Sequence, residues 1–181
     1  MSPLQSSVVS NPCPLLFLEQ NPSLSDSLCA DCDFNIDQVA TLIRPVLQAQ
    51  QRCQLSSCYI QAVAIGRTSF LITNLMQSEI SHNTAIASSW LIGRSLTCAI
   101  TVQDPSASRC HAVISHHRNE GFSITDIGSS NGTLVNRRRI PVMERRSLQD
   151  GDLIQIGSLK IEFFVTTRSQ PAANAGEATY Y

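Results

Sequence analysis

The chain has 181 residues, of which 43% are hydrophobic and 15% are charged. It is long enough for one ordinary globular domain with an appendage, and too apolar to be disordered throughout. Its net charge of -1 excludes bulk attraction to nucleic acid or to anionic lipid as the basis of its function.

The charge is unevenly distributed along the chain. Residues 1–60 hold five acidic side chains and two arginines, a balance of -3, whereas residues 61–181 hold nine acids and eleven bases, a balance of +2. Lys160 is the only lysine among these bases. Arginine presents a rigid fork that suits phosphate better than lysine does, so this bias is consistent with an anion-binding surface.

Two features predict a cytoplasmic protein without membrane insertion. The start of the chain lacks a basic segment followed by a long apolar core, and the most apolar stretch, 59–76, is interrupted by Arg67 and by polar residues. The seven cysteines are an odd number, which argues against a disulfide framework and fits reduced thiols.

Residues 1–58 are expected to form an N-terminal extension, partly disordered and partly helical. Residues 1–33 are rich in Ser, Pro and Asn and predict a loosely ordered leader with one apolar group at 15–18. Apolar residues then recur at spacings of three and four over 35–52, which predicts a helix. Asn35 is its expected N-cap with Gln38 as capping-box partner, and Pro45 predicts a kink or break near Arg44.

From residue 59 the pattern becomes that of a β-sandwich, with short apolar runs separated by turn residues. The predicted fold is therefore mainly β, with two antiparallel sheets over 59–166 and a flexible tail at 167–181. The predicted strands are 59–65, 69–75, 84–87, 89–93, 98–102, 111–116, 121–126, 133–136, 153–157 and 159–165.

Three short motifs fall on the turns between these strands. They are Gly93-Arg94, then Ser108-Arg109-Cys110-His111, then Asp126 to Thr133 with the sequence DIGSSNGT. One guanidinium with two short hydroxyl side chains can hold a phosphate group, because a charge-assisted bond of this kind contributes about 1.5–3 kcal/mol. The amide of Asn131 can both donate and accept, which suits a peptide backbone.

The identity, order and spacing of these motifs resemble the forkhead-associated (FHA) family, over roughly residues 66–165. The segment 148–157, LQDGDLIQIG, resembles the end of the family pattern. The resemblance implies a β-sandwich that binds phosphothreonine in partner proteins. It assigns phosphopeptide contacts to Arg94, Ser108, Arg109, Ser130 and Asn131, and support of the binding loops to Gly93, His111, Asp126, Gly132 and Thr133. Arg137-Arg138-Arg139 departs from the family, in which a glycine often begins that turn.

The cysteines offer a different interpretation. Two of them are separated by two residues and another two follow about twenty residues later, which is weakly similar to a zinc site or a redox switch. These weak candidates are Cys29, Cys32, Cys53 and Cys58. A helix predicted between the two pairs argues against zinc, and we expect no metal and no cofactor.

The arginines at 137–139, 145 and 146 could form a patch for an acidic partner or for nucleic acid. Alternate residues of a hairpin point to opposite faces, so we expect the cluster to be diluted into a solvated turn and no nucleic acid to bind. No Ser or Cys motif with a matched base is present, which argues against an enzyme.

The favoured hypothesis is a phosphothreonine-dependent protein-binding module, a signalling adaptor or scaffold for substrates of a Ser/Thr kinase. The first alternative is a structural or oligomerising FHA-like protein that binds independently of phosphate through the helix at 35–52 and the apolar group at 15–18. The second is a cysteine-based zinc or redox regulator. The sequence leaves the oligomeric state open.

Overall fold

The computed structural model describes residues 13–33, 35–75 and 82–168. Three helices precede the strands: α1 (Pro14–Gln20), α2 (Pro22–Asp31) and α3 (Ile36–Leu47), followed by the 3-10 turn η1 (Ala49–Arg52). The predicted disorder at 1–12 lies outside the described residues, as does the predicted tail at 167–181 except for residues 167 and 168, which belong to the last strand. In the described part, no helix is long and apolar enough to cross a bilayer.

The strands form two sheets. The larger sheet has the order β3 (His82–Asn83), β2 (Thr68–Thr73), β1 (Tyr59–Ile65), β12 (Leu159–Arg168), β11 (Asp152–Ile156), β8 (Thr133–Val135) and β9 (Arg138–Arg139). The smaller sheet has the order β10 (Arg145–Ser147), β7 (Gly121–Asp126), β6 (Ala112–His117), β4 (Ser89–Gly93) and β5 (Ile100–Thr101).

The mainly β sandwich is confirmed, but the prediction of two purely antiparallel sheets is wrong. β1 pairs with β12 in parallel, and β4 pairs with β5 in parallel. Strands that pair in parallel need a crossover connection, and here β1 and β12 are joined through nearly the whole sandwich. The alternation of apolar and polar residues within one strand does not indicate whether that strand pairs in parallel or antiparallel.

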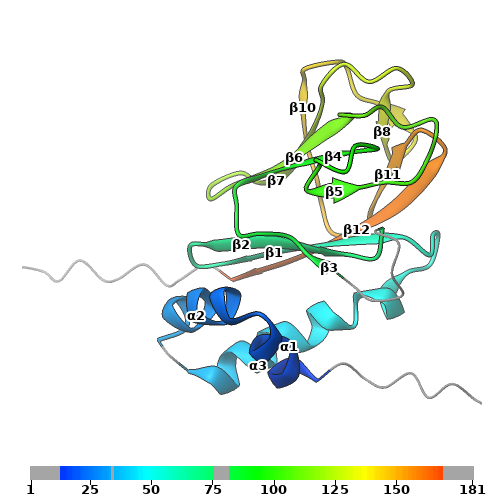
Figure 1. Cartoon of the computed structure of the whole chain (residues 1–181). Coiled ribbons are helices and arrows are strands. Elements are labelled where there is room, and N and C mark those ends of the chain that lie inside the picture. Colours follow the sequence, from blue (N-terminus) through cyan, green and yellow to red (C-terminus); the bar gives the residue numbers. More distant parts are fainter. Residues whose placement is uncertain (1–12, 34, 76–81, 169–181) are drawn as a thin grey trace, which may run out of the picture.

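The molecule has three layers, with the helices beneath the larger sheet and the smaller sheet above it (Figure 1). β1 is buried along its whole length because its two faces meet different layers. Ile60, Ala62 and Ala64 belong to the core between the sheets, whereas Tyr59, Val63 and Ile65 belong to a second core under the helices. The helical layer thus covers a sheet face that would otherwise be exposed apolar surface.

The helix predicted at 35–52 is present as α3 and η1. Asn35 caps it, because its Oδ1 accepts a bond from the backbone N–H of Gln38 at 3.0 Å. The predicted break near Arg44 is wrong: Pro45 lies inside α3, which continues to Leu47. Proline lacks the N–H that would bond the carbonyl of Thr41, and the helix continues past this missing bond.

The prediction of a loosely ordered leader is wrong for residues 14–31, which form α1 and α2. Each of these helices begins with a proline, Pro14 or Pro22, at the position where a missing N–H costs nothing. Leu18, from the apolar group at 15–18, is buried in the second core with Leu24 and Leu28.

Two buried carboxylates fasten the helical layer to the larger sheet. Asp31, at the end of α2, accepts bonds from the backbone N–H groups of Arg67 and Thr68 and from the Thr68 hydroxyl at 2.6 Å. Glu162 of β12 accepts three backbone N–H bonds of 2.6–2.8 Å from residues 54, 55 and 56. These charge-assisted bonds hold the end of α2 against the start of β2 through Asp31, and they hold the connection between η1 and β1 through Glu162.

Candidate functional site

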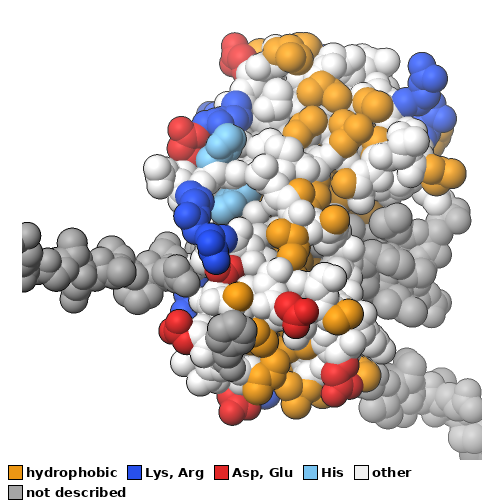
Figure 2. Space-filling view, turned by 60° about the vertical axis from the view of Figure 1, so that its left-hand side comes forward, with side chains coloured by type: hydrophobic (Ala, Val, Ile, Leu, Met, Phe, Trp, Pro, Cys, Tyr) orange, Lys and Arg blue, Asp and Glu red, His pale blue; other side chains and the backbone are white. Residues whose placement is uncertain are grey.

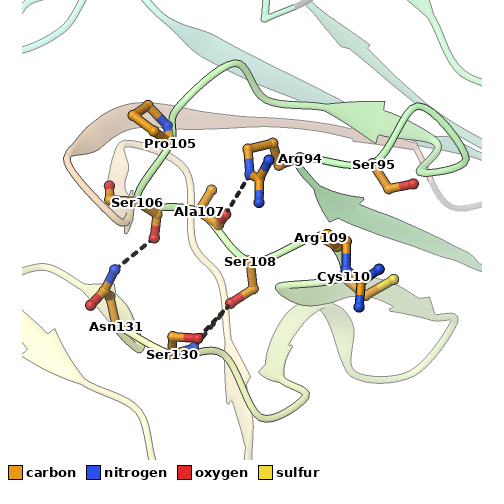
Figure 3. A pocket seen from close by; sticks show the side chains of 10 residues that line it. All are labelled: Arg94, Ser95, Pro105, Ser106, Ala107, Ser108, Arg109, Cys110, Ser130 and Asn131. Carbon is orange, nitrogen blue, oxygen red and sulfur yellow. Dashed lines mark hydrogen bonds between the residues drawn. The ribbon is translucent and has the colours of Figure 1, made fainter.

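The three motifs of the sequence meet at one end of the sandwich. Arg94 directly follows β4, the loop 102–111 joins β5 to β6, and the loop 127–132 joins β7 to β8. Together they surround a pocket of about 610 Å³, which we call the Arg94 pocket. It is lined by Arg94, Ser95, Pro105, Ser106, Ala107, Ser108, Arg109, Cys110, Ser130 and Asn131 (Figure 3).

Gly93 brings the first two loops into contact. A Cβ atom at this position would lie 2.3 Å from the backbone oxygen of Arg109, so no residue other than glycine fits without moving the backbone. The backbone N–H groups of Arg94 and Ser95 donate to the carbonyls of Ser108 and Arg109 at 2.9 and 3.0 Å. The start of the Arg94 loop is therefore fixed against the loop that carries Ser108.

The Arg94 side chain is exposed and points between Ala107 and Ser108 (Figure 3). Its Nε donates to the backbone oxygen of Ala107 at 3.2 Å. Within the described residues it forms no ion pair, and Asp104 and Asp126, its conceivable partners, are engaged by other groups. Its guanidinium is thus oriented by the loop and can accept an anion.

Ser108 and Ser130 lie next to each other at the pocket, and their side chains point toward each other (Figure 3). The backbone N–H of Ser130 donates to Ser108 Oγ at 3.0 Å, and the two hydroxyl oxygens are 3.5 Å apart. The Ser130 side chain is exposed and the Ser108 side chain is half-buried. Two short hydroxyl groups and loop amides are thus available on one wall of the pocket.

Asn131 and Arg109 occupy two further sides of the pocket. Asn131 Nδ2 donates to the backbone oxygen of Ser106 at 2.7 Å. A peptide that pairs with Asn131 must therefore share or exchange this bond. Arg109 is exposed and projects toward Cys110, away from the two serines (Figure 3). The structure thus brings Arg94, Ser108 and Ser130 together and leaves Arg109 at the rim.

His111 lies beneath the pocket and links its two serine loops. The backbone N–H of Ser108 donates to Nδ1 at 3.0 Å, and Nε2 lies 3.2 Å from the carbonyl oxygen of Gly132. Because Nδ1 accepts, Nε2 must carry the proton and donate to Gly132. Burial of the imidazole, which is 0% exposed, lowers the pKa of His111, and this outweighs the opposing effects of Gly132 and nearby carboxylates.

Asp126 shapes the third loop from its buried position at the end of β7. Its Oδ1 accepts bonds from the backbone N–H groups of Gly128 and Ser129 at 2.9 and 2.8 Å, and its Oδ2 accepts from the hydroxyls of Ser129 and Thr133 at 2.5 and 2.7 Å. Burial alone raises the pKa of Asp126, but these bonds outweigh it and hold the pKa at about 2. Asp126 and Thr133 therefore support the loop and lie outside the pocket.

Sequence reasoning missed a second set of supports. Asp104 accepts bonds from the hydroxyls of Ser106 and Ser158, and Ser106 Oγ accepts from the backbone N–H of Ser158 at 2.8 Å. Hydrogen bonds from Ser106 and Ser158 lower the pKa of Asp104. The Asp-Pro-Ser turn at 104–106 could have indicated the Asp104 contact with Ser106, but no local signal indicates Ser158.

The cysteines do not assemble into a metal site. In the described ranges, no group of three or more His, Cys, Asp or Glu side chains is placed to hold a metal ion. All seven cysteines are free thiols. Burial raises the pKa of the Cys32 and Cys53 thiols, which favours the protonated, less reactive form.

The loops that form the Arg94 pocket all join strands of the β-sandwich. Residues 90–157 match the family model of the FHA domain. This segment is therefore similar to an FHA domain, and it contains every loop of the Arg94 pocket.

Similar proteins come from distant organisms. Human kanadaptin is 32% identical over 77 residues, which are 37% of this chain and 10% of kanadaptin. The glycogen accumulation regulator GarA of Mycobacterium tuberculosis (strain H37Rv) is 38% identical over 71 residues, which are 39% of this chain and 41% of GarA. The oxoglutarate dehydrogenase inhibitor of Corynebacterium efficiens is 39% identical over 71 residues, 47% of its length. The chain thus spans less than half of these relatives.

Solved structures of FHA domains are also similar. One, from a study of phosphothreonine-dependent FHA domain interactions, aligns with a TM-score of 0.40 and 27% identity over 46% of this chain and 82% of its own. The N-terminal FHA domain of Rad53p from S. cerevisiae, in complex with a phosphothreonine peptide, aligns with a TM-score of 0.36 and 27% identity over 38% of this chain and 56% of its own.

Proposed function

We propose that the chain is a phosphothreonine-dependent protein-binding module that recruits phosphorylated partner proteins, with the cytoplasm as its setting. The observation that carries the proposal is the convergence of Arg94, Ser108 and Ser130 on one open pocket. A phosphate ester carries nearly two negative charges and three acceptor oxygens at neutral pH. The guanidinium supplies charge, and the serine hydroxyls with their loop amides supply directed hydrogen bonds.

The roles of the remaining pocket residues follow from their positions. Asn131 lies next to Ser130 on the rim, where its amide can bind the backbone of a peptide. Arg109 is proposed to contact the peptide beside the phosphorylated residue. His111, Gly93, Asp126, Gly132 and Thr133 are proposed to hold the loops in the binding arrangement, and no phosphate contact is assigned to them.

The arrangement favours binding over catalysis. Ser108 has Ser130 as its hydroxyl partner instead of a base. His111 accepts a bond from the backbone N–H of Ser108 through Nδ1, and its Nε2 lies against the carbonyl oxygen of Gly132. A serine nucleophile needs a base within hydrogen-bond reach of its hydroxyl. Both ring nitrogens of His111 instead contact backbone groups.

The oligomerising alternative gains little support. The apolar stripe of α3 that would drive assembly is buried against the larger sheet, with Val39, Ile43 and Val46 each 0% exposed. Leu15 and Leu16 stay about half exposed, at 47% and 51%. Two half-exposed leucines on a short helix are ordinary for a protein surface.

A phosphopeptide library tests the proposed function. The full chain is titrated against arrayed peptides that carry phosphothreonine, phosphoserine or unmodified threonine in otherwise identical sequences. We expect binding to phosphothreonine peptides, with loss of that binding after phosphatase treatment of the array. Retention of the same peptides after dephosphorylation would support phosphate-independent binding and contradict the proposal.

A further inference from the structure

A second pocket lies between β9 and β10, which are the terminal strands of the larger and the smaller sheet. Its volume is about 130 Å³. It is lined by two arginines of β9, two arginines of β10 and the segment between these strands: Arg138, Arg139, Ile140, Pro141, Glu144, Arg145 and Arg146. We call its four arginines the arginine cluster.

The expected dilution of these arginines over two faces is wrong. β9 and β10 belong to different sheets, so the chain turns between them and both strands border the same pocket. The alternation rule applies within one sheet and does not predict how two sheet edges meet. The four arginines of the cluster therefore line one pocket together.

The arginine cluster has a large excess of positive charge. All four side chains are exposed, and Glu144 is the one carboxylate among the residues that line the pocket. Arg145 forms an ion pair with Glu120, whereas Arg138 and Arg146 form no ion pair with any described residue. Guanidinium groups bind carboxylates and phosphates through paired hydrogen bonds, so an anionic ligand matches this pocket.

The cluster adjoins the loop that carries Ser130 and Asn131. A Cβ atom on Gly132 would lie 2.5 Å from Cζ of Arg139, so the Arg139 guanidinium lies against the backbone of Gly132. Gly132 directly follows the two pocket residues Ser130 and Asn131. A polypeptide that leaves the Arg94 pocket over this loop therefore reaches the cluster without crossing another element.

Charge is also unevenly distributed over the face of the molecule shown in Figure 2. β8 and β10 lie at the end of the molecule farthest from the helices (Figure 1). Acidic side chains are scattered over the lower, helical part of the surface, and most of the Lys and Arg side chains in view belong to the sandwich part (Figure 2). An acidic ligand would thus be drawn to the sandwich and kept from the helical layer.

We propose that the arginine cluster binds a second anionic group of the same phosphopeptide that occupies the Arg94 pocket. The group is a run of Asp or Glu side chains or a second phosphate that flanks the phosphothreonine. This inference rests on the proposed function and names the chemistry of the partner. The cluster selects among phosphothreonine sequences, while the Arg94 pocket supplies the requirement for phosphate.

The test compares three peptides that share one phosphothreonine. The first has neutral flanks, the second has Asp and Glu in the flanks, and the third has one flanking phosphoserine. Calorimetry measures their affinities for the wild type, for Arg138→Gln/Arg146→Gln, and for the control Arg44→Gln/Lys160→Gln. The control removes the same charge from exposed positions on α3 and β12.

We expect the wild type and the control to bind an acidic or doubly phosphorylated peptide about fivefold more tightly than the neutral one. In Arg138→Gln/Arg146→Gln this preference should disappear while the affinity for the neutral phosphothreonine peptide stays unchanged. A preference for only one of the two anionic peptides identifies carboxylate or phosphate as the source and supports the proposal.

Other results would overturn the inference. Equal wild-type affinities for all three peptides, or a preference that survives in Arg138→Gln/Arg146→Gln, would remove the role of the cluster and leave the proposed function standing. Failure of the wild type to bind any phosphothreonine peptide would remove both. Tighter binding of single-stranded RNA than of the acidic peptide, lost in the same variant, would assign the cluster to nucleic acid instead.

Discussion

Among single residues, Asp126 accepts four hydrogen bonds within the segment 126–133 and is 0% exposed. Asp126→Asn replaces one accepting oxygen with a donor that faces other donors. We expect it to lower the free energy of unfolding by about 3 kcal/mol. Urea denaturation measures this, with the exposed Asp37→Asn on α3 as control, for which the expected loss is below about 1 kcal/mol. A similar small loss in both variants would contradict the role of Asp126.

His111 makes a pH-dependent contribution to stability. Its pKa is lowered in the folded protein, so between the ordinary pKa of 6.5 and the folded value the unfolded chain binds more protons. The stabilisation is therefore present above pH 6.5 and is lost as the pH falls through this interval. The slope for one histidine reaches about 1.4 kcal/mol per pH unit.

The variant His111→Gln isolates this contribution. His116 has a pKa lowered mainly by burial and adds a slope of the same sign, which stays in the variant. We expect denaturation between pH 6.5 and 5 to show a shallower loss of stability in His111→Gln than in the wild type. Identical slopes would mean that His111 titrates alike in the folded and unfolded states.

At the scale of elements, the helical layer and the sandwich share the second hydrophobic core. Ile43 of α3 is 0% exposed in that core, whereas Ile36 of the same helix is 42% exposed. Ile43→Ala should lower the free energy of unfolding by about 2–5 kcal/mol, and Ile36→Ala by less than about 1 kcal/mol. The two variants remove the same atoms from one helix.

Trp90, the only tryptophan, reports on the sandwich in this experiment. It is buried in the core between the two sheets and not in the core under the helices. If the helices and the sandwich unfold as one unit across the boundary near residue 58, Ile43→Ala lowers the urea midpoint measured by Trp90 fluorescence. An unchanged midpoint would show that the helices unfold independently of the sandwich.

Particular elements show which local signals sufficed for prediction. β1, β4 and β7 have the predicted bounds because alternating or continuous apolar runs end at clear turns. β9 and β10 were missed because exposed arginines form most of both strands, so no apolar period marks them. The predicted strand at 84–87 is wrong, since β3 ends at Asn83. Edge strands depend on their neighbours more than on their own sequence.

At the scale of the whole molecule, the sequence indicates which loops meet and some of the residues that hold them, but not the supporting contacts between distant segments. Gly93, Arg94, Ser108 and Ser130 could be predicted because their motifs are local. The contact of Asp104 with Ser158 joins segments 54 residues apart, the β5–β6 loop of the smaller sheet and the β11–β12 turn of the larger one. Likewise, the apolar stripe of α3 predicted a buried face, but only the three-layer packing shows that the larger sheet covers it.

We propose that the guanidinium of Arg94 and the hydroxyls of Ser108 and Ser130 together bind a phosphate ester. Calorimetric titration of Arg94→Ala against a phosphothreonine peptide that the wild type binds tests this claim most directly, with Arg44→Ala as a matched surface control. We predict a loss of affinity of at least about tenfold for Arg94→Ala, a stability within about 1 kcal/mol of the wild type, and unchanged affinity for Arg44→Ala. Wild-type affinity in a folded Arg94→Ala protein would contradict the claim.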